Sequence, residues 1–195
     1  MRDRAPLVIV TGTSATLQIP DYLVALRPVL GTGFRVLMTR SATRFLPAES
    51  VGWFCSEVIT PETPGVNPIE LALTATGIVV LPASAQILGC AALGLATSPA
   101  ATALLAAPAG CLFFPHMNRV MWDKDVLQGH VATLRAAGHV VVDPASREGF
   151  EIWRGGTGQS QAMPGPAQVA KVVGGWLPTP ENLSPLGHRP EERHV

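Results

Sequence analysis

The sequence predicts a single-domain α/β protein whose parallel sheet is doubly wound in the Rossmann-like manner. Short, unbroken apolar runs such as Leu7–Val10 and Ile78–Leu81 are typical of strands that are buried on both faces. Segments with helical character separate these runs, which is the alternation expected of a parallel sheet covered by helices. The chain has 195 residues, of which 47% are hydrophobic, and this suffices for one well-buried core.

Taken in order, the apolar runs and the segments between them predict the individual elements. Strands are expected at residues 7–10, 34–38, 78–81, 111–114 and 140–142. Helices are expected after residue 14 to about residue 30, and at 71–76, 84–96, 121–137 and 166–176. These elements form one domain over residues 1–177. Within it, the Gly-rich, polar stretch 152–164 is expected to be a mobile loop, and the Pro-rich tail 178–195 is expected to be disordered.

The composition narrows the possible partners. Charged residues make up only 14% of the chain and the formal net charge is zero, which leaves little electrostatic basis for binding nucleic acid or a membrane surface. So little polar surface favours burial in a homo-oligomer. The first apolar run is too short for a signal-peptide core or a membrane span, and the three cysteines lack metal-ligand spacing. We therefore expect a cytoplasmic protein with reduced, structural cysteines and no metal.

Two hydroxyl-rich segments follow the first two predicted strands. Gly12-Thr13-Ser14 places hydroxyls and backbone N–H groups where a helix begins, which suits a phosphate but equally suits a plain helix cap. The segment lacks the dinucleotide fingerprint G-x-G-x-x-G. Thr39, together with Ser41 and Thr43, offers a second cluster after the next strand. Together the two segments suit a mononucleotide phosphate better than a dinucleotide.

Two further strand-to-helix junctions are more distinctive. Pro82-Ala83-Ser84-Ala85-Gln86 combines small residues, which let a flat ring approach the backbone, with groups that can hydrogen-bond the edge of the ring. Its alternative interpretation is an ordinary tight turn with Ser84 as helix cap. Pro115–Trp122 follows the apolar run 111–114, and Asn118 within it either binds a ligand or caps a helix whose neighbours Met117 and Trp122 belong to the core. Ligands of open α/β sheets bind outside the carboxyl ends of the strands, so we expect one site built from both junctions.

These two strings resemble the P-A-S-A-N-T and P-x-M-N-x-x-M-W signatures of the homo-oligomeric flavin-containing cysteine decarboxylases. That family includes the phosphopantothenoylcysteine decarboxylases and the epidermin- and cypemycin-type enzymes that act on a C-terminal cysteine in peptide biosynthesis. The resemblance spans roughly residues 7–176 and implies a bound FMN, with FAD as a possibility. The residues expected at the cofactor are Gly12, Thr13, Ser14, Thr39, Ser41, Thr43, Pro82, Ala83, Ser84, Ala85, Gln86, His116 and Met117.

The resemblance also assigns roles toward the substrate. It places Asn118 at the carboxylate of the substrate cysteine and so implies a catalytic role for Asn118. His116, two residues earlier, is our own candidate for a second catalytic residue, because it is the only His within a signature. The residues expected to contact substrate are Asn118, Met121, Ile152, Trp153, Arg154 and Met163. In the loop 152–164, the polar residues Gln159, Ser160 and Gln161 suit hydrogen bonding to a peptide backbone, and they equally suit ordinary loop polarity.

The chain departs from the family pattern at several positions. Pro68 stands where the family's catalytic His would be, so either that His is dispensable or another group replaces it. His116 is the candidate replacement, and the alternative is a loop residue without a role. Gly155 stands where the pantothenate-pathway enzymes carry the loop Cys that completes a saturated product. Gln86 replaces an Asn of the first signature, and Thr97-Ser98 replaces an Asp-Asn pair.

The resulting expectation is a flavin-dependent enzyme that oxidatively decarboxylates the C-terminal cysteine of a ribosomally made precursor peptide. The enethiol product would feed an aminovinyl-cysteine ring closed by a partner cyclase. The family assembles trimers, often four of them in a dodecamer. Two alternatives stay open: a phosphopantothenoylcysteine decarboxylase, and a non-catalytic flavoprotein or regulatory subunit. A flavin prenyltransferase of similar fold is disfavoured because those proteins lack the P-x-M-N-x-x-M-W string.

Overall fold

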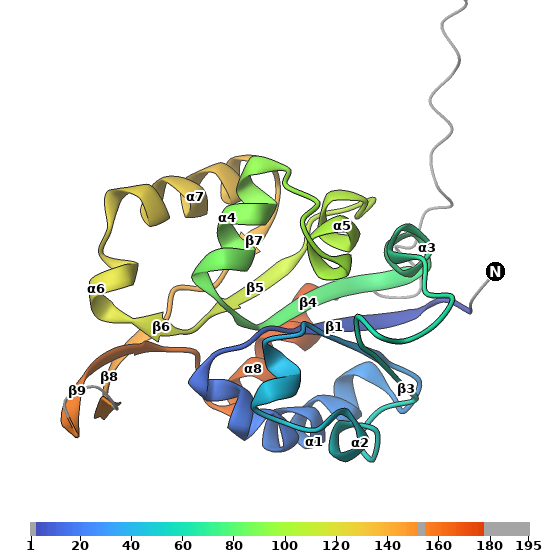
Figure 1. Ribbon diagram of the computed structural model, residues 1–195, viewed down its shortest axis with the longest axis horizontal. Helices are drawn as coiled ribbons and strands as arrows, with labels where there is room; N and C mark the ends of the chain where they lie inside the picture. Colours follow the sequence, from blue (N-terminus) through green and yellow to red (C-terminus); the bar gives the residue numbers. More distant parts are fainter. Residues whose placement is uncertain (1–2, 152–154, 178–195) are drawn as a thin grey trace, which may run out of the picture.

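The molecule is built around a six-stranded parallel sheet with the strand order β3-β2-β1-β4-β5-β7 (Figure 1). We describe it from a computed structural model, which covers residues 3–151 and 155–177. The strands of this sheet are β1 (Ala5–Val10), β2 (Arg35–Met38), β3 (Glu57–Ile59), β4 (Ala75–Ala83), β5 (Leu112–Pro115) and β7 (Val140–Val141). The expected fold class, a Rossmann-like doubly wound parallel sheet in one domain, is confirmed.

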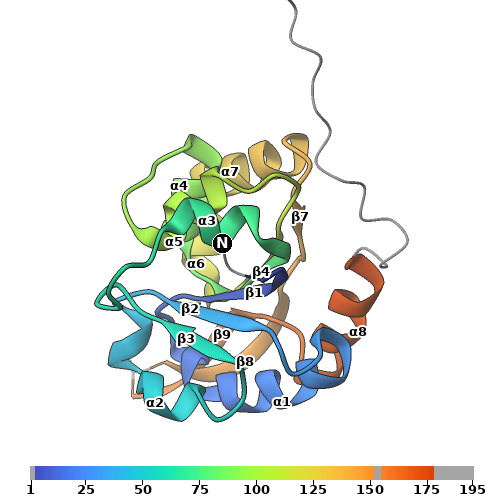
Figure 2. The same ribbon diagram turned by 90° about the vertical axis from the view of Figure 1, so that its right-hand side faces the viewer.

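Helices cover both faces of the sheet (Figures 1 and 2). The helices are η1 (Ser14–Gln18), α1 (Ile19–Leu30), η2 (Ala42–Arg44), α2 (Ala48–Val51), α3 (Pro68–Leu73), α4 (Ala85–Leu93), α5 (Pro99–Leu105), α6 (Arg119–Trp122), α7 (Asp125–Ala136) and α8 (Pro166–Trp176). Alternate strand residues enter two separate cores: Leu7 and Ile9 pack with α3, α4, α5 and α7, whereas Val8 and Val10 pack with α1, α2 and α8. This explains why the strands read as unbroken apolar runs.

The strand order reverses between β1 and β4. β1 pairs in parallel with β2 on one side and with β4 on the other, through the pairs Leu7↔Arg35 and Leu7↔Ile78. The connections that leave β1 and β4 therefore diverge to opposite sides, and a crevice opens between them at the carboxyl ends of the strands. This crevice is where the two signature junctions were expected to meet.

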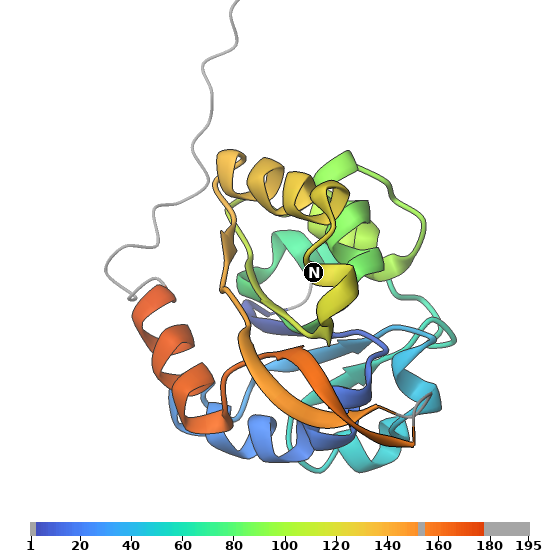
Figure 3. The ribbon, with the colours of Figure 1, turned by 90° about the vertical axis from the view of Figure 1, so that its left-hand side faces the viewer.

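A second, smaller sheet was not expected from the sequence. Its order is β6-β9-β8, with β6 (Met117–Asn118), β8 (Ala145–Glu151) and β9 (Gly156–Ala162) all antiparallel, and Figure 3 shows β8 and β9 side by side. Residues 156–162, which were expected to lie in a mobile loop, form strand β9. Polar and glycine residues occupy both strands, so the sequence lacks the apolar alternation that marks a strand, and ladder hydrogen bonds hold them instead. Residues 152–154 and the tail 178–195 lie outside the described residues.

Several element boundaries differ from the expected ones. The helix expected at 84–96 ends at Leu93, because Gly94 takes a left-handed conformation (φ +67°) that closes α4. A separate helix, α5, then begins at Pro99 with Ser98 as its cap. The short elements β3, α2 and α5 were not expected. No helix within residues 3–151 and 155–177 is long and apolar enough to cross a membrane.

Candidate functional site

A cavity of about 350 Å³ lies at the crevice between β1 and β4. Its wall comes from the segments that follow β1, β2 and β4, from the first turns of α4, from the α4–α5 connection and from α6. The lining residues are Thr11, Gly12, Thr39, Arg40, Ser41, Ser84, Ala85, Gln86, Ile87, Cys90, Thr97, Ser98 and Met121. Because Met121 belongs to the second signature and Ser84–Gln86 to the first, the two junctions share one cavity, as the sequence predicted.

Thr11 fixes the relative position of the two strand ends. Its hydroxyl donates to the carbonyl oxygen of Pro82 over 2.7 Å and accepts from the backbone N–H of Ser84 over 3.0 Å. The side chain is buried, so these hydrogen bonds are shielded from water and hold their geometry. Thr16 continues the network by donating to the carbonyl of Thr11 over 2.8 Å and accepting from the backbone N–H of Thr13 over 3.1 Å. The loop after β1 is thereby tied to the loop after β4.

Gly12 lets the loops after β1 and β2 touch. A Cβ built at Gly12 would lie 2.7 Å from the carbonyl carbon of Ser41 and 2.9 Å from its carbonyl oxygen. Backbone atoms cannot move aside as the end of a flexible side chain can, so only glycine permits this approach. The contact places the hydroxyl-rich segments that begin at Gly12 and at Thr39 on one wall of the cavity.

The first signature serves both as a helix cap and as a cavity wall. The hydroxyl of Ser84 accepts from the backbone N–H of Ile87 over 3.4 Å and so caps α4. Ser84, Ala85 and Gln86 nevertheless line the cavity, with Gln86 exposed at its rim. The two interpretations of this string are compatible, because a capped helix start presents its small residues to the crevice.

His116 joins the second signature to the first. Its backbone N–H donates to the carbonyl of Ala83 over 3.1 Å, and its ring Nε2 lies 3.4 Å from the hydroxyl oxygen of Ser14. The ring Nδ1 is buried without a hydrogen-bond partner among the described residues. Burial lowers the pKa of His116 below its ordinary value of 6.5. The imidazole is therefore neutral at neutral pH and able to accept a proton.

Asn118 caps α6 and lies beside the small sheet. Its side-chain oxygen accepts from the backbone N–H of Val120 over 2.8 Å, which fixes the plane of the amide. In the ladder, Asn118 pairs with Ser160 of β9. Met117 is buried and Trp122 packs against the core, as the capping interpretation required. The small sheet therefore includes residues of the second signature, because β6 is formed by Met117 and Asn118.

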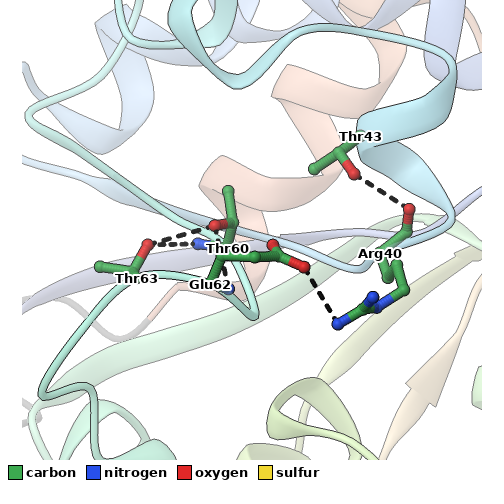
Figure 4. A network of polar contacts seen from close by, with 5 residues as sticks. All are labelled: Arg40, Thr43, Thr60, Glu62 and Thr63. Carbon is green, nitrogen blue, oxygen red and sulfur yellow. Dashed lines mark hydrogen bonds and ion pairs between the residues drawn. The ribbon is translucent and has the colours of Figure 1, made fainter.

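Other residues expected at the site lie elsewhere. Thr43 donates to the carbonyl of Arg40 over 3.0 Å and lines no part of the cavity (Figure 4). Pro82, Ala83 and Met117 are buried in strands, and Thr13 and Ser14 flank the cavity through the loop after β1. Met163 was expected to contact substrate, but its side chain is 2% exposed in the core with α1 and α8, which leaves it no surface for a ligand. Ile152, Trp153 and Arg154 lie outside the described residues.

Sequence reasoning missed several cavity residues. Arg40, between two residues that were singled out, lines the cavity and pairs with Glu62 after β3 over 3.1 Å (Figure 4). Cys90 lies one helical turn after Gln86, and its Sγ is 3.4 Å from the hydroxyl of Thr97. The helical spacing from Gln86 was a usable signal for Cys90. Thr97 and Ser98 were noticed only as departures from the family pattern, yet both line the cavity.

Pro68 takes no part in this cavity. It is the first residue of α3, where Asn67 caps the helix by accepting from the backbone N–H of Ile69 over 2.9 Å and of Glu70 over 3.4 Å. A proline suits that position because its missing N–H is not needed there. α3 leads into the amino end of β4, whereas the cavity lies at the carboxyl end. Position 68 is therefore not part of the lining of this cavity.

The cysteines are free thiols, as expected. Burial raises the pKa of Cys111 to about 12 and that of Cys55 to about 11, so neither supplies a thiolate near neutral pH. No group of three or more His, Cys, Asp or Glu side chains within the described part of the chain is arranged to hold a metal ion. The side chains at or beside the cavity supply hydroxyls, the amide of Gln86, the guanidinium of Arg40, the thiol of Cys90 and the neutral imidazole of His116.

A doubly wound sheet with a hydroxyl-rich cavity at its switch point has the architecture of the α/β proteins that bind a ligand outside the carboxyl ends of their strands. The chain belongs to the Flavoprotein family, whose model matches residues 1–176. It is 34% identical to mersacidin decarboxylase of a Bacillus species, over 80% of this chain and 81% of that protein. It is 32% identical to the coenzyme A biosynthesis bifunctional protein CoaBC of Mycobacterium tuberculosis over 73% of this chain, but the match spans only 36% of that longer protein.

Solved structures agree with this family. A structure of the peptidyl-cysteine decarboxylase EpiD, in a variant complexed with the substrate peptide DSYTC, superimposes with a TM-score of 0.80 at 25% identity. The match covers 88% of this chain and 99% of that chain.

The residues at the cavity fit a flavin. Gly12 and Ala85 leave the wall open to a flat ring, and the hydroxyls of Thr39 and Ser41 suit its phosphate. Beside the cavity, the buried Thr13 Oγ1 and His116 Nδ1 have no partner among the described residues, although buried polar atoms are nearly always satisfied. A ligand with a polar edge would supply those partners.

Proposed function

We propose that this protein is a flavin-dependent decarboxylase that acts on the C-terminal cysteine of a ribosomally made precursor peptide. The observation that carries the proposal is the junction of three features at one place. The two signatures share a cavity, and the small sheet that begins at Asn118 provides polar strands beside it. The similarity to mersacidin decarboxylase supports the same activity.

In this proposal FMN, or the FMN half of FAD, occupies the cavity. A flavin bound there would supply the oxidant for the reaction, as the acceptor of a hydride from Cβ of the substrate cysteine. The side chains at the hydroxyl-rich wall hold its phosphate, and the small residues of the first signature lie against its ring. The resulting thioaldehyde has its carboxylate β to a C=S group, so loss of carbon dioxide leaves a stabilised enethiolate.

His116 is assigned as the acceptor of the thiol proton. A neutral imidazole is the form that accepts a proton, and the burial of His116 lowers its pKa and maintains that form. Ser14 Oγ, 3.4 Å from Nε2, orients the ring. Thiol pKa values in solution are about 8.5, so only a modest assistance is required. This accounts for an active enzyme in which Pro68 replaces the family's His.

Asn118 is assigned to the carboxylate that leaves. Its capping bond to Val120 fixes the plane of the amide, so the side chain donates in a defined direction. A neutral donor holds the carboxylate without forming an ion pair that would oppose its conversion to neutral carbon dioxide. Gln159, Ser160 and Gln161 on β9 are assigned to the peptide backbone upstream of the cysteine.

The enethiol is the expected final product. Gly155 stands at the position of the proton-donating loop Cys of the pantothenate-pathway enzymes, and glycine donates no side-chain proton. The chain therefore stops at the oxidised product, which a partner cyclase would convert into an aminovinyl-cysteine ring.

We also propose that copies of the chain assemble into a homo-oligomer, in trimers that build a dodecamer. Five large apolar side chains are exposed on α3, on α5 and where α4 ends: Ile69, Leu73, Leu93, Leu95 and Leu105. Such a concentration is typical of protein interfaces. Light scattering is expected to give an oligomer that Leu105→Glu disrupts, whereas Leu17→Glu, on the far face, leaves it intact. A monomeric wild type would contradict this part of the proposal.

The activity is tested by mass spectrometry with short peptides ending in cysteine. A loss of ~46 Da, one carbon dioxide and two hydrogens, is expected, and the same peptides ending in serine or in cysteine carboxamide are expected to stay unchanged. A loss of only ~44 Da would instead indicate the saturated product of a pantothenate-pathway enzyme. No loss with any peptide, despite bound flavin, would indicate a non-catalytic flavoprotein.

The role of His116 is tested with a matched pair of variants. His116→Gln is expected to slow turnover about tenfold or more near pH 7, and the deficit should shrink near pH 9, where the thiol ionises unaided. His130→Gln on α7, away from the cavity, is the control and should turn over as the wild type does. A deficit in His116→Gln that is the same at both pH values would contradict the proton-accepting role.

A further inference from the structure

One face of the small antiparallel sheet carries three polar side chains in a row. Residues that lie directly opposite each other in an antiparallel ladder project to the same face of the sheet. Asn118 of β6 lies opposite Ser160 of β9, and Ser160 lies opposite Arg147 of β8. An amide, a hydroxyl and a guanidinium therefore follow one another across the three strands.

The positions around this row are small. Side chains of a strand alternate between its two faces, so Gly158 and Ala162 share the face of Ser160 on β9. Ala145 of β8 pairs with Ala162 and lies on the same face. These three positions carry at most a methyl group, so they leave room for an extended peptide to lie along the row. The hydroxyl of Ser160 donates to the carbonyl oxygen of Arg147 over 3.3 Å, which ties the middle of the row to its end.

Arg147 supplies a charge to this face. Its side chain is exposed, and no carboxylate in the described part of the chain forms an ion pair with it. Its neighbour Glu148 projects to the opposite face of β8. Burial raises the pKa of Tyr22 on α1, and the nearby charge of Arg147 opposes this rise. The guanidinium therefore lies close enough to α1 to act on its side chains, and it is available to an anion that binds beside the small sheet.

The spacing of the strands relates Arg147 to one position of a bound peptide. Neighbouring strands lie about 4.8 Å apart, so the backbone of Arg147 is roughly 10 Å from that of Asn118. An extended peptide advances about 3.3 Å per residue, so about three residues span this separation. With the cysteine carboxylate at Asn118, the third residue before the cysteine lies at Arg147. A guanidinium binds a carboxylate through paired N–H donors, so this position suits an acidic side chain.

We infer that Arg147 is a specificity-determining residue, which selects peptides with an aspartate or a glutamate at the third residue before the C-terminal cysteine. The inference rests on the proposed function, because it takes Asn118 as the site of the substrate carboxylate. The peptide lies along the row, Ser160 hydrogen-bonds its backbone midway, and Arg147 pairs with the acidic side chain. Because this ion pair is partly exposed, it changes the affinity by a small factor.

The first test compares two short peptides that end in cysteine and differ only in a glutamate or a glutamine at the third residue before it. The wild-type protein is expected to favour the glutamate peptide by about threefold to fivefold in kcat/KM, through KM rather than kcat, as a partly exposed ion pair would. A glutamate directly before the cysteine should give no such preference. Equal kcat/KM values for the first two peptides would overturn the inference and leave the proposed decarboxylation intact.

A matched set of variants assigns the preference to Arg147. Arg147→Gln is expected to bring the ratio of the two kcat/KM values close to one. Arg147→Glu should favour a peptide with lysine at the same position over the glutamate peptide, which a merely structural role would not produce. Arg27→Gln removes the same charge from the exposed last turn of α1 and should keep the wild-type preference. A preference that survives Arg147→Gln, or that Arg27→Gln also abolishes, would overturn the assignment.

A binding measurement separates this inference from the proposed activity. The same peptides with serine in place of the terminal cysteine keep the carboxylate and are expected to resist turnover. In a calorimetric titration, the wild-type protein as purified should bind the glutamate form more tightly than the glutamine form, and Arg147→Gln should bind both equally. Equal binding by the wild type would overturn the inference. A difference in binding without decarboxylation of the cysteine peptides would support the role of Arg147 and contradict the proposed activity.

Discussion

The two sheets of this protein are built on opposite principles. Every residue of β2 and β5 is buried, and these strands are held by apolar cores on both faces. β9 alternates between exposed and half-buried residues over most of its length. Hydrogen bonds to β6 and β8 hold it in place. The difference separates two tasks: the parallel sheet fixes the cavity rigidly, and the antiparallel sheet offers polar backbone beside it at little cost in stability.

The largest loss of stability is expected from a substitution in the parallel sheet. Phe114→Ala in β5 removes a fully buried ring and should lower the free energy of unfolding by about 3–5 kcal/mol. Chemical denaturation monitored by circular dichroism measures this. The control is Thr157→Ala, exposed on β9, which should change the free energy by no more than about 0.5 kcal/mol. Similar losses in the two variants would contradict the division between the sheets.

The same contrast explains which strands could be predicted from the sequence and which could not. The apolar runs of β1, β4 and β5 carry their own signal, because burial on both faces leaves no polar residue in them. β9 gave no such signal, since it pairs with β8 and the two-residue β6, and Gln161 is the only one of its residues that is buried. β8 and β9 are neighbours along the chain and form a hairpin, but a hairpin of polar and glycine residues lacks the apolar alternation of a half-buried strand, so its composition suggests only a loop.

An intermediate loss of stability is expected from removing a hydrogen bond between α1, which packs on the parallel sheet, and the segment that follows β9. The hydroxyl of Tyr22 on α1 donates to the carbonyl of Pro164, just after β9, over 2.9 Å. Tyr22→Phe keeps the buried ring and removes this bond, which should cost about 0.5–1.5 kcal/mol. Hydrogen exchange should show faster opening of the amides of β9 than in the wild type, with those of β5 unchanged. Faster exchange in β5 as well would mean that Tyr22 supports the whole core.

A fall in pH is expected to destabilise the parallel sheet before it destabilises the antiparallel one. His139 Nδ1 accepts from the backbone N–H of Cys111 over 2.9 Å, just before β5, and burial lowers the pKa of His139 below its ordinary 6.5. A lowered pKa in the folded state means that stability is fully present above pH 6.5 and is lost as the pH falls below it. The same sign applies to His116, whereas β8 and β9 contain no histidine.

The measurement is the Tm between pH 7.5 and pH 5.5. The Tm should fall over this interval, and the fall should be smaller in His139→Asn, whose side-chain oxygen can accept the same N–H without titrating. A Tm that is constant, or that rises as the pH falls, would contradict the sign.

The candidate site was predictable to the extent that its residues follow strands along the chain. Ser84, Ala85 and Gln86 come directly after β4 and line the cavity as expected, because strand ends converge at the switch point. A second cavity of about 320 Å³, which adjoins the first at Thr39, Arg40, Thr97 and Ser98, was not predictable. Pro61 and Pro99–Ala100 come from separate connections, and only the packing of α5 beside the loop after β3 brings them together.

The smallest effect on stability is expected from substitutions in the antiparallel sheet, where enzyme kinetics distinguish the variants better than stability does. The hydroxyl of Ser146 donates to the side-chain oxygen of Gln159 over 2.8 Å in an exposed pair, so Gln159→Ala and Ser146→Ala each remove the same bond. Both should change the free energy of unfolding by no more than about 0.5 kcal/mol. If Gln159 binds the peptide backbone, Gln159→Ala should raise KM for a cysteine-ended peptide by several-fold with kcat nearly unchanged, and Ser146→Ala should not. Equal KM values in the two variants would show that the pair only steadies the strand, and the peptide contacts would then have to come from Ser160 or Gln161.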